Sequence, residues 1–261
     1  MASRPVVLVT GAARRLGREI ALTLGAAGWD VGVHYRGSHD EAESTATDLR
    51  AAGARAETFQ ADLSDEAACR ALVPSVLQHF GRLDAVVNNA SLFEYDRPET
   101  FGFDAMDRHW RANVAPSVVL AQALHDALAG QPESSTGCVV NLIDQKLWNP
   151  NPDYFSYTLS KAALQSATVM LAQSLAPRVR VCGVAPGVTL VSGPMTETEF
   201  DTARKLTPLK RSSTPQDIAR AVRFLLESPA ITGTTLMVDG GQHLQAQARD
   251  VLFLANPAKE H

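Results

Sequence analysis

Cysteine is scarce in this sequence, and no pattern of metal ligands accompanies it. The chain has 261 residues and only three cysteines, Cys69, Cys138 and Cys182. None belongs to a Cys-x-x-Cys pair, and no cluster of histidines lies near one at metal-ligand spacing. All three fall in apolar strand-like or helix-like runs, which predicts buried free thiols in a reducing compartment, with no disulfide and no metal site.

Long apolar runs and an excess of positive charge are also missing. No stretch reaches the roughly 18 apolar residues of a membrane-spanning helix, and the N-terminus shows no signal-peptide pattern. Lysine and arginine number 24 against 28 acidic residues, so the formal net charge is -4. A chain without a basic surplus is not expected to bind nucleic acid or an anionic membrane. We therefore expect a cytoplasmic protein whose substrate is a small molecule.

What the sequence does contain is a regular alternation of short apolar runs and longer helical patterns. Most of the short runs are continuously apolar, which is typical of strands covered on both faces. The strand-like runs are Pro5–Val9, Val31–Tyr35, Arg55–Gln60, Ala85–Asn88, Cys138–Ile143, Val179–Val184 and Thr235–Val238. The helical patterns are Leu16–Ala27, Asp40–Ala52, Glu66–Phe80, Phe103–Ala129, Tyr154–Leu175 and Pro215–Glu227. This order predicts an α/β fold over residues 1–261, a single Rossmann-type doubly wound parallel sheet with helices on both faces.

Three segments lie outside this alternation. Residues 148–153 hold two prolines and two asparagines and are expected to form a surface loop. Residues 187–208 are too long for a plain turn, so we expect a substrate loop near 187–210. The tail, residues 244–261, is polar apart from Val251–Leu254, a patch expected to dock on the domain or on a neighbouring subunit.

A glycine-containing turn follows the first strand-like run. Residues 10–17 read Thr-Gly-Ala-Ala-Arg-Arg-Leu-Gly and lead into a helical pattern. In such a turn, backbone amides and the positive end of the helix can hold a pyrophosphate. The usual middle glycine is replaced by Arg15, so the pattern alone also fits a plain strand–helix turn. The candidate phosphate-binding residues here are Gly11, Arg14, Arg15, Leu16 and Gly17.

The end of the second strand-like run favours NADP(H) over NAD(H). An NAD site usually places an acidic residue there to hold the ribose diol, but after Tyr35 the first acidic residue is Asp40. Arg14, Arg36 and Ser38 offer two cations and a hydroxyl, which suit a 2'-phosphate; a solvated surface role is the alternative for Arg36. The candidate residues of this region are His34, Tyr35, Arg36 and Ser38 for the ribose, Asp62 and Leu63 for the adenine, and Asn89, Ala90 and Ser91 beside the nicotinamide ribose.

The candidate catalytic residues lie in the fifth helical pattern. Tyr157 and Lys161 are four positions apart and share one face of a helix. A neighbouring cation lowers the pKa of a phenol, so the tyrosine can exchange a proton near neutral pH. Asn113, from the preceding helical pattern, is expected to hold a water against Lys161 and so to supply protons.

Together these residues resemble the short-chain dehydrogenase/reductase family over nearly the whole chain. The matching positions are Thr10–Gly17, Asp62, Asn88–Ala90, Asn113, Tyr157, Lys161, Pro186–Gly187 and Asp239–Gly241. The resemblance implies hydride transfer from a nicotinamide, with Tyr157 as the proton donor and Lys161 on the ribose hydroxyls. It also assigns Pro186, Gly187 and Val188 to the cofactor, and it implies a homo-oligomer, a dimer or tetramer packed through the long helices.

One departure from the family narrows the substrate. Most members carry a serine 13 positions before the tyrosine, where this chain has Asp144. An ionised carboxylate only accepts hydrogen bonds, so it would repel the negative charge that develops on a ketone oxygen. A substrate with N–H donors, or an imine that takes up a proton, suits it better; an apolar pocket could also keep Asp144 protonated as an acid. Both alternatives point to a nitrogen heterocycle, whereas the structural alternative is a turn residue at a strand end.

Arg15, Asp144 and Phe93 occur together, and this set resembles the pteridine reductase branch of the family, which includes dihydromonapterin reductases. The resemblance implies NADPH-dependent reduction of a dihydropterin to a tetrahydropterin, with the pterin between the nicotinamide and the ring of Phe93. The substrate residues would be Arg15, Ser91, Phe93, Asp144 and Tyr157; whether dihydrofolate is accepted stays open. Ordinary packing equally explains Phe93 and three weaker candidates for pocket walls, Trp148, Leu190 and Met195.

Two other functions remain open. A carbonyl or 3-oxoacyl reductase with an unusual Asp144 would keep the fold and change the substrate. A non-catalytic NADP-binding regulator is disfavoured, because it would have no physical need for Asn113, Tyr157 and Lys161 together.

Overall fold

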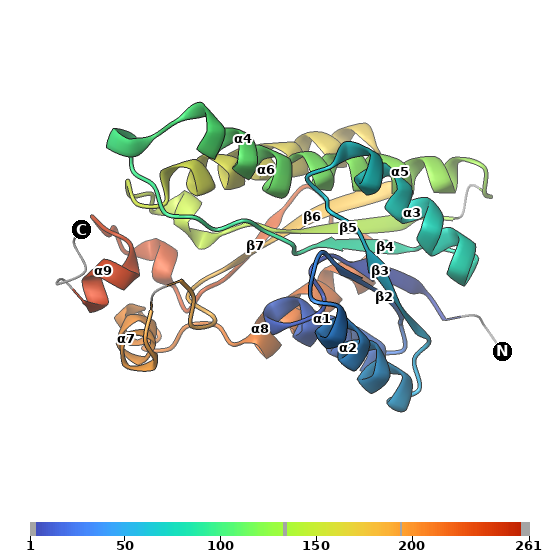
Figure 1. Ribbon diagram of the computed structural model, residues 1–261, viewed down its shortest axis with the longest axis horizontal. Helices are drawn as coiled ribbons and strands as arrows, with labels where there is room; N and C mark the ends of the chain where they lie inside the picture. Colours follow the sequence, from blue (N-terminus) through green and yellow to red (C-terminus); the bar gives the residue numbers. More distant parts are fainter. Residues whose placement is uncertain (1–3, 133–134, 194, 257–261) are drawn as a thin grey trace.

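Seven parallel strands form one sheet in a computed structural model that describes residues 4–132, 135–193 and 195–256 (Figure 1). The strand order is β3-β2-β1-β4-β5-β6-β7, and every neighbouring pair is parallel. The strands are β1 (Val6–Val9), β2 (Asp30–Tyr35), β3 (Ala56–Gln60), β4 (Ala85–Asn88), β5 (Gly137–Leu142), β6 (Val179–Pro186) and β7 (Thr235–Val238). The predicted doubly wound parallel sheet is therefore confirmed.

Helices cover both faces of the sheet (Figure 1). One face packs against α1 (Arg15–Ala26), α2 (His39–Ala51) and α8 (Pro215–Glu227). The other face packs against α3 (Glu66–Phe80), α5 (Ala115–Ala129) and α6 (Phe155–Ser174), with α4 (Phe103–Asn113) lying against α5 and α6. Both faces of the sheet are thus apolar and covered by helices, which explains why the strand sequences are continuously apolar.

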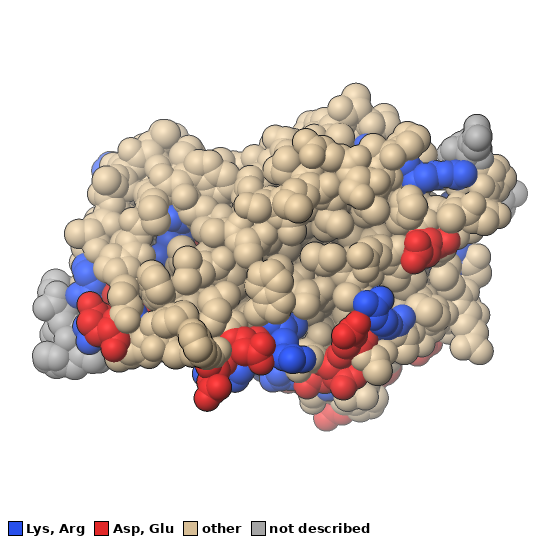
Figure 2. Space-filling view, turned by 90° about the horizontal axis from the view of Figure 1, so that it is seen from above, with Lys and Arg blue, Asp and Glu red and all other residues tan. Residues whose placement is uncertain are grey.

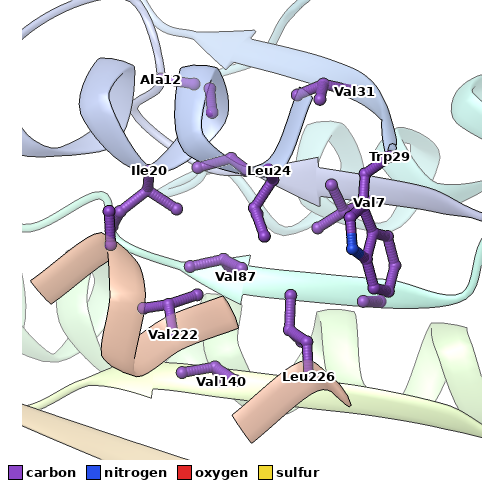
Figure 3. Close-up of a cluster of buried hydrophobic side chains, with 14 of the residues drawn as sticks. Val7, Ala12, Ile20, Leu24, Trp29, Val31, Val87, Val140, Val222 and Leu226 are labelled. Atoms are coloured by element: carbon purple, nitrogen blue, oxygen red, sulfur yellow. The ribbon is translucent and has the colours of Figure 1, made fainter. Parts of the chain in front are cut away.

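The packing of α1 and α8 against the middle of the sheet is shown in Figure 3. Ile20 and Leu24 of α1 and Val222 of α8 are fully buried over the central strands, where Val87 and Val140 lie. This apolar contact fixes the N-terminus of α1 at the carboxyl edge of β1, which is where the glycine-containing turn lies.

The long helical pattern 103–129 is two helices, α4 and α5. The break is at Val114, whose backbone angles are φ -112° and ψ -61°. Pro116, near the start of α5, has no N–H to donate to the preceding turn, so one continuous helix would lose a hydrogen bond there. The prediction of a single helix was wrong for this reason.

Two segments outside the expected alternation of strands and helices each contain a short helix. The 187–208 segment contains a helix, α7 (Glu197–Ala203), and the tail contains another, α9 (Val251–Ala255). The two helices pack together in a small apolar cluster that includes Met195, Ala203 and Phe253, so the apolar patch of the tail docks on its own chain. Residues 149–153 form an irregular connection in which Pro150 and Pro152 are exposed, as expected of a surface loop, but Asp153 at its end is completely buried beneath the tail.

The three cysteines are free and buried, as predicted. Across the described residues, no helix has the length and apolarity needed to cross a membrane.

Candidate active site

Two adjoining pockets open at the carboxyl ends of the central strands, the edge at which ligands of doubly wound sheets bind. One lies over the glycine-containing turn and the ends of β2 and β3. The other lies over the ends of β5 and β6 and the start of α6. The two share the wall residues Arg15, Leu16, Asn89 and Ser91. A single extended ligand can therefore reach from the first pocket, the cofactor pocket, into the second, the substrate pocket.

At its two glycines, the turn at the start of α1 lies too close to neighbouring backbone for a side chain to fit. Gly11 has a φ of +62°, and a Cβ at Gly17 would overlap the carbonyl oxygen of Gly11. Arg15 also adopts a left-handed conformation, with a φ of +56°, at the position where a glycine was expected. Its guanidinium crosses between the two pockets and donates to the carbonyl oxygen of Val191 at 2.6 Å. A non-glycine residue costs about 1–2 kcal/mol in this region of backbone space, so the position of Arg15 is held by its surroundings.

His34 supports the turn from β2. Its Nδ1 accepts a hydrogen bond from the Gly11 amide at 3.0 Å, so its Nε2 carries the proton and faces the Ala61 carbonyl oxygen at 3.1 Å. Burial lowers the pKa of His34 to about 4, which keeps the ring neutral. His34 was predicted to contact the cofactor; in the structure it lines the cofactor pocket while both ring nitrogens hold the turn against β3.

The far end of the cofactor pocket is cationic and hydroxylic. Arg14, Arg36 and Ser38 line it together with Asp62. Hydrogen bonds from the Ser64 hydroxyl and amide, with a smaller contribution from the charge of Arg36, lower the pKa of Asp62 and keep it ionised. The other predicted cofactor residues on this wall are Tyr35, Leu63 and Ala90, while Pro186, Gly187 and Val188 line the substrate pocket.

Asp144 and Tyr157 meet in the substrate pocket. Asp144 follows β5, and Tyr157 lies in the first turns of α6. The Tyr157 hydroxyl donates to Oδ2 of Asp144 at 2.8 Å, and the Lys146 amide donates to Oδ1 at 2.8 Å. Lys161 Nζ donates to the Leu142 carbonyl oxygen at 2.7 Å and lies 5.7 Å from the centroid of the Tyr157 ring.

Burial controls the protonation of this group. It raises the pKa of Tyr157 well above the usual range, and the Asp144 carboxylate raises it further. Burial also raises the pKa of Asp144 and lowers that of Lys161 to about 8. The pKa of Tyr157 was expected to be lowered by Lys161, but burial and the neighbouring carboxylate raise it on balance. Tyr157 therefore keeps its proton and is available as a donor.

Asn113 links three elements at the base of the pocket. Its Oδ1 accepts from the Leu92 amide at 2.7 Å and the Ser91 hydroxyl at 3.1 Å. Its Nδ2 donates to the Leu92 carbonyl oxygen at 3.0 Å and the Ser160 hydroxyl at 2.9 Å. These bonds use the whole capacity of the amide, so its side chain is not free to hold the predicted water. It fixes the chain after β4 against α6.

Phe93 forms one side of the substrate pocket. Its ring stacks on Tyr154 at 4.2 Å and 14°, and it meets the Tyr157 ring edge-on at 4.7 Å. The side chain is 39% exposed. One face of Phe93 is thus already covered by Tyr154.

Sequence reasoning missed the contribution of the C-terminal segment. Asp250, Val251 and Leu252 line the substrate pocket, and so do Lys146 and Tyr154. The apolar patch in the tail was the one available signal. Of the weaker candidates for pocket walls, Leu190 and Met195 line the pocket, whereas Trp148 is 41% exposed and lies outside it.

A family model described as enoyl-(acyl carrier protein) reductase matches residues 11–243 of this chain, from the glycine-containing turn to beyond β7. The chain belongs to the short-chain dehydrogenase/reductase family. It is an oxidoreductase of that family.

The relatives of this short-chain reductase include pterin and folate enzymes. FolM alternative dihydrofolate reductase 1 from Brucella canis, crystallised with NADP, is 40% identical, with a TM-score of 0.87 over 96% of this chain and 98% of that one. Pteridine reductase 1 of Leishmania tarentolae is 35% identical over 92% of this chain and 96% of its own length. The 3-oxoacyl-(acyl-carrier-protein) reductase FabG of Staphylococcus aureus is 31% identical over 91% and 97% respectively.

Proposed function

We propose that this reductase uses NADPH to convert a dihydropterin to a tetrahydropterin, with Tyr157 as the proton donor. The observation that carries the proposal is the hydrogen bond from the Tyr157 hydroxyl to the Asp144 carboxylate at 2.8 Å. A carboxylate at this position suits a substrate that presents nitrogen donors or takes up a proton on nitrogen. The similarity to a pteridine reductase and to FolM proteins supports the same substrate class.

The residues of the cofactor pocket fit NADP(H). The absence of side chains at Gly11 and Gly17 lets a pyrophosphate lie against the backbone at the start of α1. Arg14, Arg36 and Ser38 suit a 2'-phosphate, and the FolM structures from Brucella contain NADP. When bound, NADPH supplies a hydride.

The side chains of the substrate pocket then have distinct tasks. Tyr157 transfers its proton to the ring nitrogen of the C=N bond whose carbon receives the hydride, so one N–H and one C–H bond form. Asp144 holds the phenol in place and, because burial raises its pKa, can take up a proton from solvent and pass it to the phenolate. Lys161, anchored on the Leu142 carbonyl oxygen, places a cation near the phenolate that remains.

Binding of the pterin would use both walls of the pocket. Phe93 offers one ring face for stacking, and Ser91 and Arg15 offer hydrogen-bond donors where the two pockets meet. Asp144 accepts from the nitrogen donors of the heterocycle.

Reduction of a ketone is the second candidate, favoured by the similarity to 3-oxoacyl reductases. Asp144 argues against it, because this residue supplies no hydroxyl donor to a carbonyl oxygen unless it is protonated. The relative rates on the two substrate classes therefore decide between the candidates.

Consumption of NADPH, followed by its absorbance, tests the proposal with a dihydropterin and a short 3-oxoacyl thioester side by side. We expect turnover of the dihydropterin alone, a loss of about 100-fold or more in Tyr157→Phe, and loss of pterin reduction in Asp144→Ser. Turnover of the thioester alone, undiminished in Asp144→Ser, would overturn the proposal. Binding of NADPH by both variants serves as the control for folding.

A further inference from the structure

One wall of the substrate pocket comes from the last described part of the chain. Asp250, Val251 and Leu252 line the pocket, and α9 lies beside α7 at the carboxyl edge of the sheet (Figure 1). The segment is anchored by Asp153, which is completely buried. Asp153 accepts two hydrogen bonds from Arg249, at 2.8 and 3.0 Å, and one from the Asp250 amide at 2.7 Å. The side chain of Asp250 is therefore held in place before any ligand arrives.

Asp250 forms an ion pair with Lys146 on this wall. Lys146 Nζ lies 3.1 Å from Oδ2 of Asp250, and the side chains are only 5% and 19% exposed. Oδ1 of Asp250 accepts from the Leu252 amide at 3.1 Å. Tyr154 presents its ring face 5.6 Å from Nζ. The pair is thus largely removed from bulk water and belongs to the pocket.

The ammonium of Lys146 has more donors than acceptors around it. It carries three N–H groups, and Asp250 is its one hydrogen-bond acceptor among the residues the structure describes. A buried donor without a partner costs about 1–3 kcal/mol. Because Lys146 lines the substrate pocket, an oxygen of a bound ligand can accept the remaining bonds.

The pair as a whole indicates the kind of group that it binds. Lys146 and Asp250 cancel in charge, so an anionic substituent gains little from the first and is repelled by the second. The neighbouring Asp144 is also acidic, so it does not attract an anion to this wall. A hydroxyl group both donates and accepts, and it can bond to the ammonium and to the carboxylate together. A purely apolar substituent would leave the ammonium donors unsatisfied.

We propose that Lys146 and Asp250 are specificity-determining residues that bind a neutral, hydroxyl-bearing substituent of the substrate. The inference rests on the proposed function in that the substituent is carried by a pterin ring. It assigns the C-terminal segment of the chain to its own active site.

Binding to the NADP⁺-loaded enzyme tests this inference apart from turnover. The probes are two oxidised pterins, one with a polyhydroxylated 6-substituent and one with a 6-methyl group, followed by quenching of pterin fluorescence. We expect the wild type to bind the hydroxylated pterin about tenfold or more tightly, as bonds to charged groups allow. Lys146→Met and Asp250→Asn should lose this preference while keeping their affinity for 6-methylpterin. Lys205→Met, at an exposed lysine, is the matched control.

Asp250→Asn keeps the size of the side chain, so the test does not depend on whether the fold tolerates Lys146→Met. Equal binding of the two pterins by the wild type would overturn the inference, as would equal losses on both pterins in the variants. Failure of the wild type to bind either pterin would overturn both this inference and the proposed function. Preferential binding without reduction would contradict the proposed function alone and leave the inference standing.

Discussion

Burial and a shared hydrogen bond make Tyr157 a proton donor and Asp144 an acceptor, although both side chains are acids. Burial raises the pKa of each, so Tyr157 keeps its proton and donates it in a hydrogen bond that Asp144 accepts. The hydrogen bond between them places the phenol proton on a line towards the carboxylate. A serine in place of Asp144 could donate to a substrate oxygen, which an ionised carboxylate cannot do. This single position therefore separates the two candidate substrate classes.

His34 is expected to make the stability of the fold sensitive to mild acid. Its pKa is about 4 when folded and 6.5 in a model peptide, so below pH 6.5 the unfolded chain binds a proton that the folded chain refuses. Stability is thus lost as the pH falls from 6.5 towards 4, by about 3 kcal/mol at most for this shift. Urea unfolding of the wild type and His34→Asn across this range measures it. The same pH slope in both proteins would contradict the assignment.

At the scale of elements, the C-terminal segment depends on one buried carboxylate. Asp153 comes from the connection between β5 and α6, and it binds Arg249, the Asp250 amide and the Tyr95 hydroxyl. The apolar contact between α9 and α7, the Lys146–Asp250 ion pair and the hydrogen bond from Asn256 to Glu199 hold the same segment. The position of the substrate-pocket wall therefore follows from these contacts.

Asp153→Asn is expected to loosen the segment without unfolding the sheet. Removing one partner of a buried ion pair costs about 3 kcal/mol or more, which should raise the rate of proteolysis within residues 245–256 by about tenfold or more. Mass spectrometry of the early fragments measures this rate. NADPH binding should stay unchanged, because the cofactor pocket lies over other strands. Asp126→Asn, at an exposed residue of α5, is the control, and equal rates in the two variants would contradict the anchoring role.

At the scale of the whole molecule, one broad face carries little charge. Between them, α5 and α6 contain only two charged residues, Asp126 and Lys161, and the view from above shows a wide area without charged side chains (Figure 2). Apolar side chains are exposed on α4 and α6, with Phe103 86% and Met170 66% accessible. Such a surface is typical of an interface between subunits.

We therefore expect the protein to be a homo-oligomer, a dimer or tetramer, in solution. Light scattering during size-exclusion chromatography measures its mass. Met170→Glu places a charge on this face and should shift the distribution towards smaller species, whereas Lys205→Met should not. A wild type that is monomeric at micromolar and higher concentrations would contradict the prediction.

Features that depend on local pattern could be predicted from the sequence. Continuous apolar runs indicated strands buried on both faces, and the four-residue spacing of Tyr157 and Lys161 placed them on one helix face. Asp144 could be found because it stands at a fixed distance from Tyr157 in the chain. The burial that raises the pKa of Tyr157 and the pairing of Lys146 with Asp250 across 104 positions came only from the tertiary structure. Periodicity reports which side of an element is apolar, but contact between distant segments and the loss of water around a charge arise only when the elements pack together.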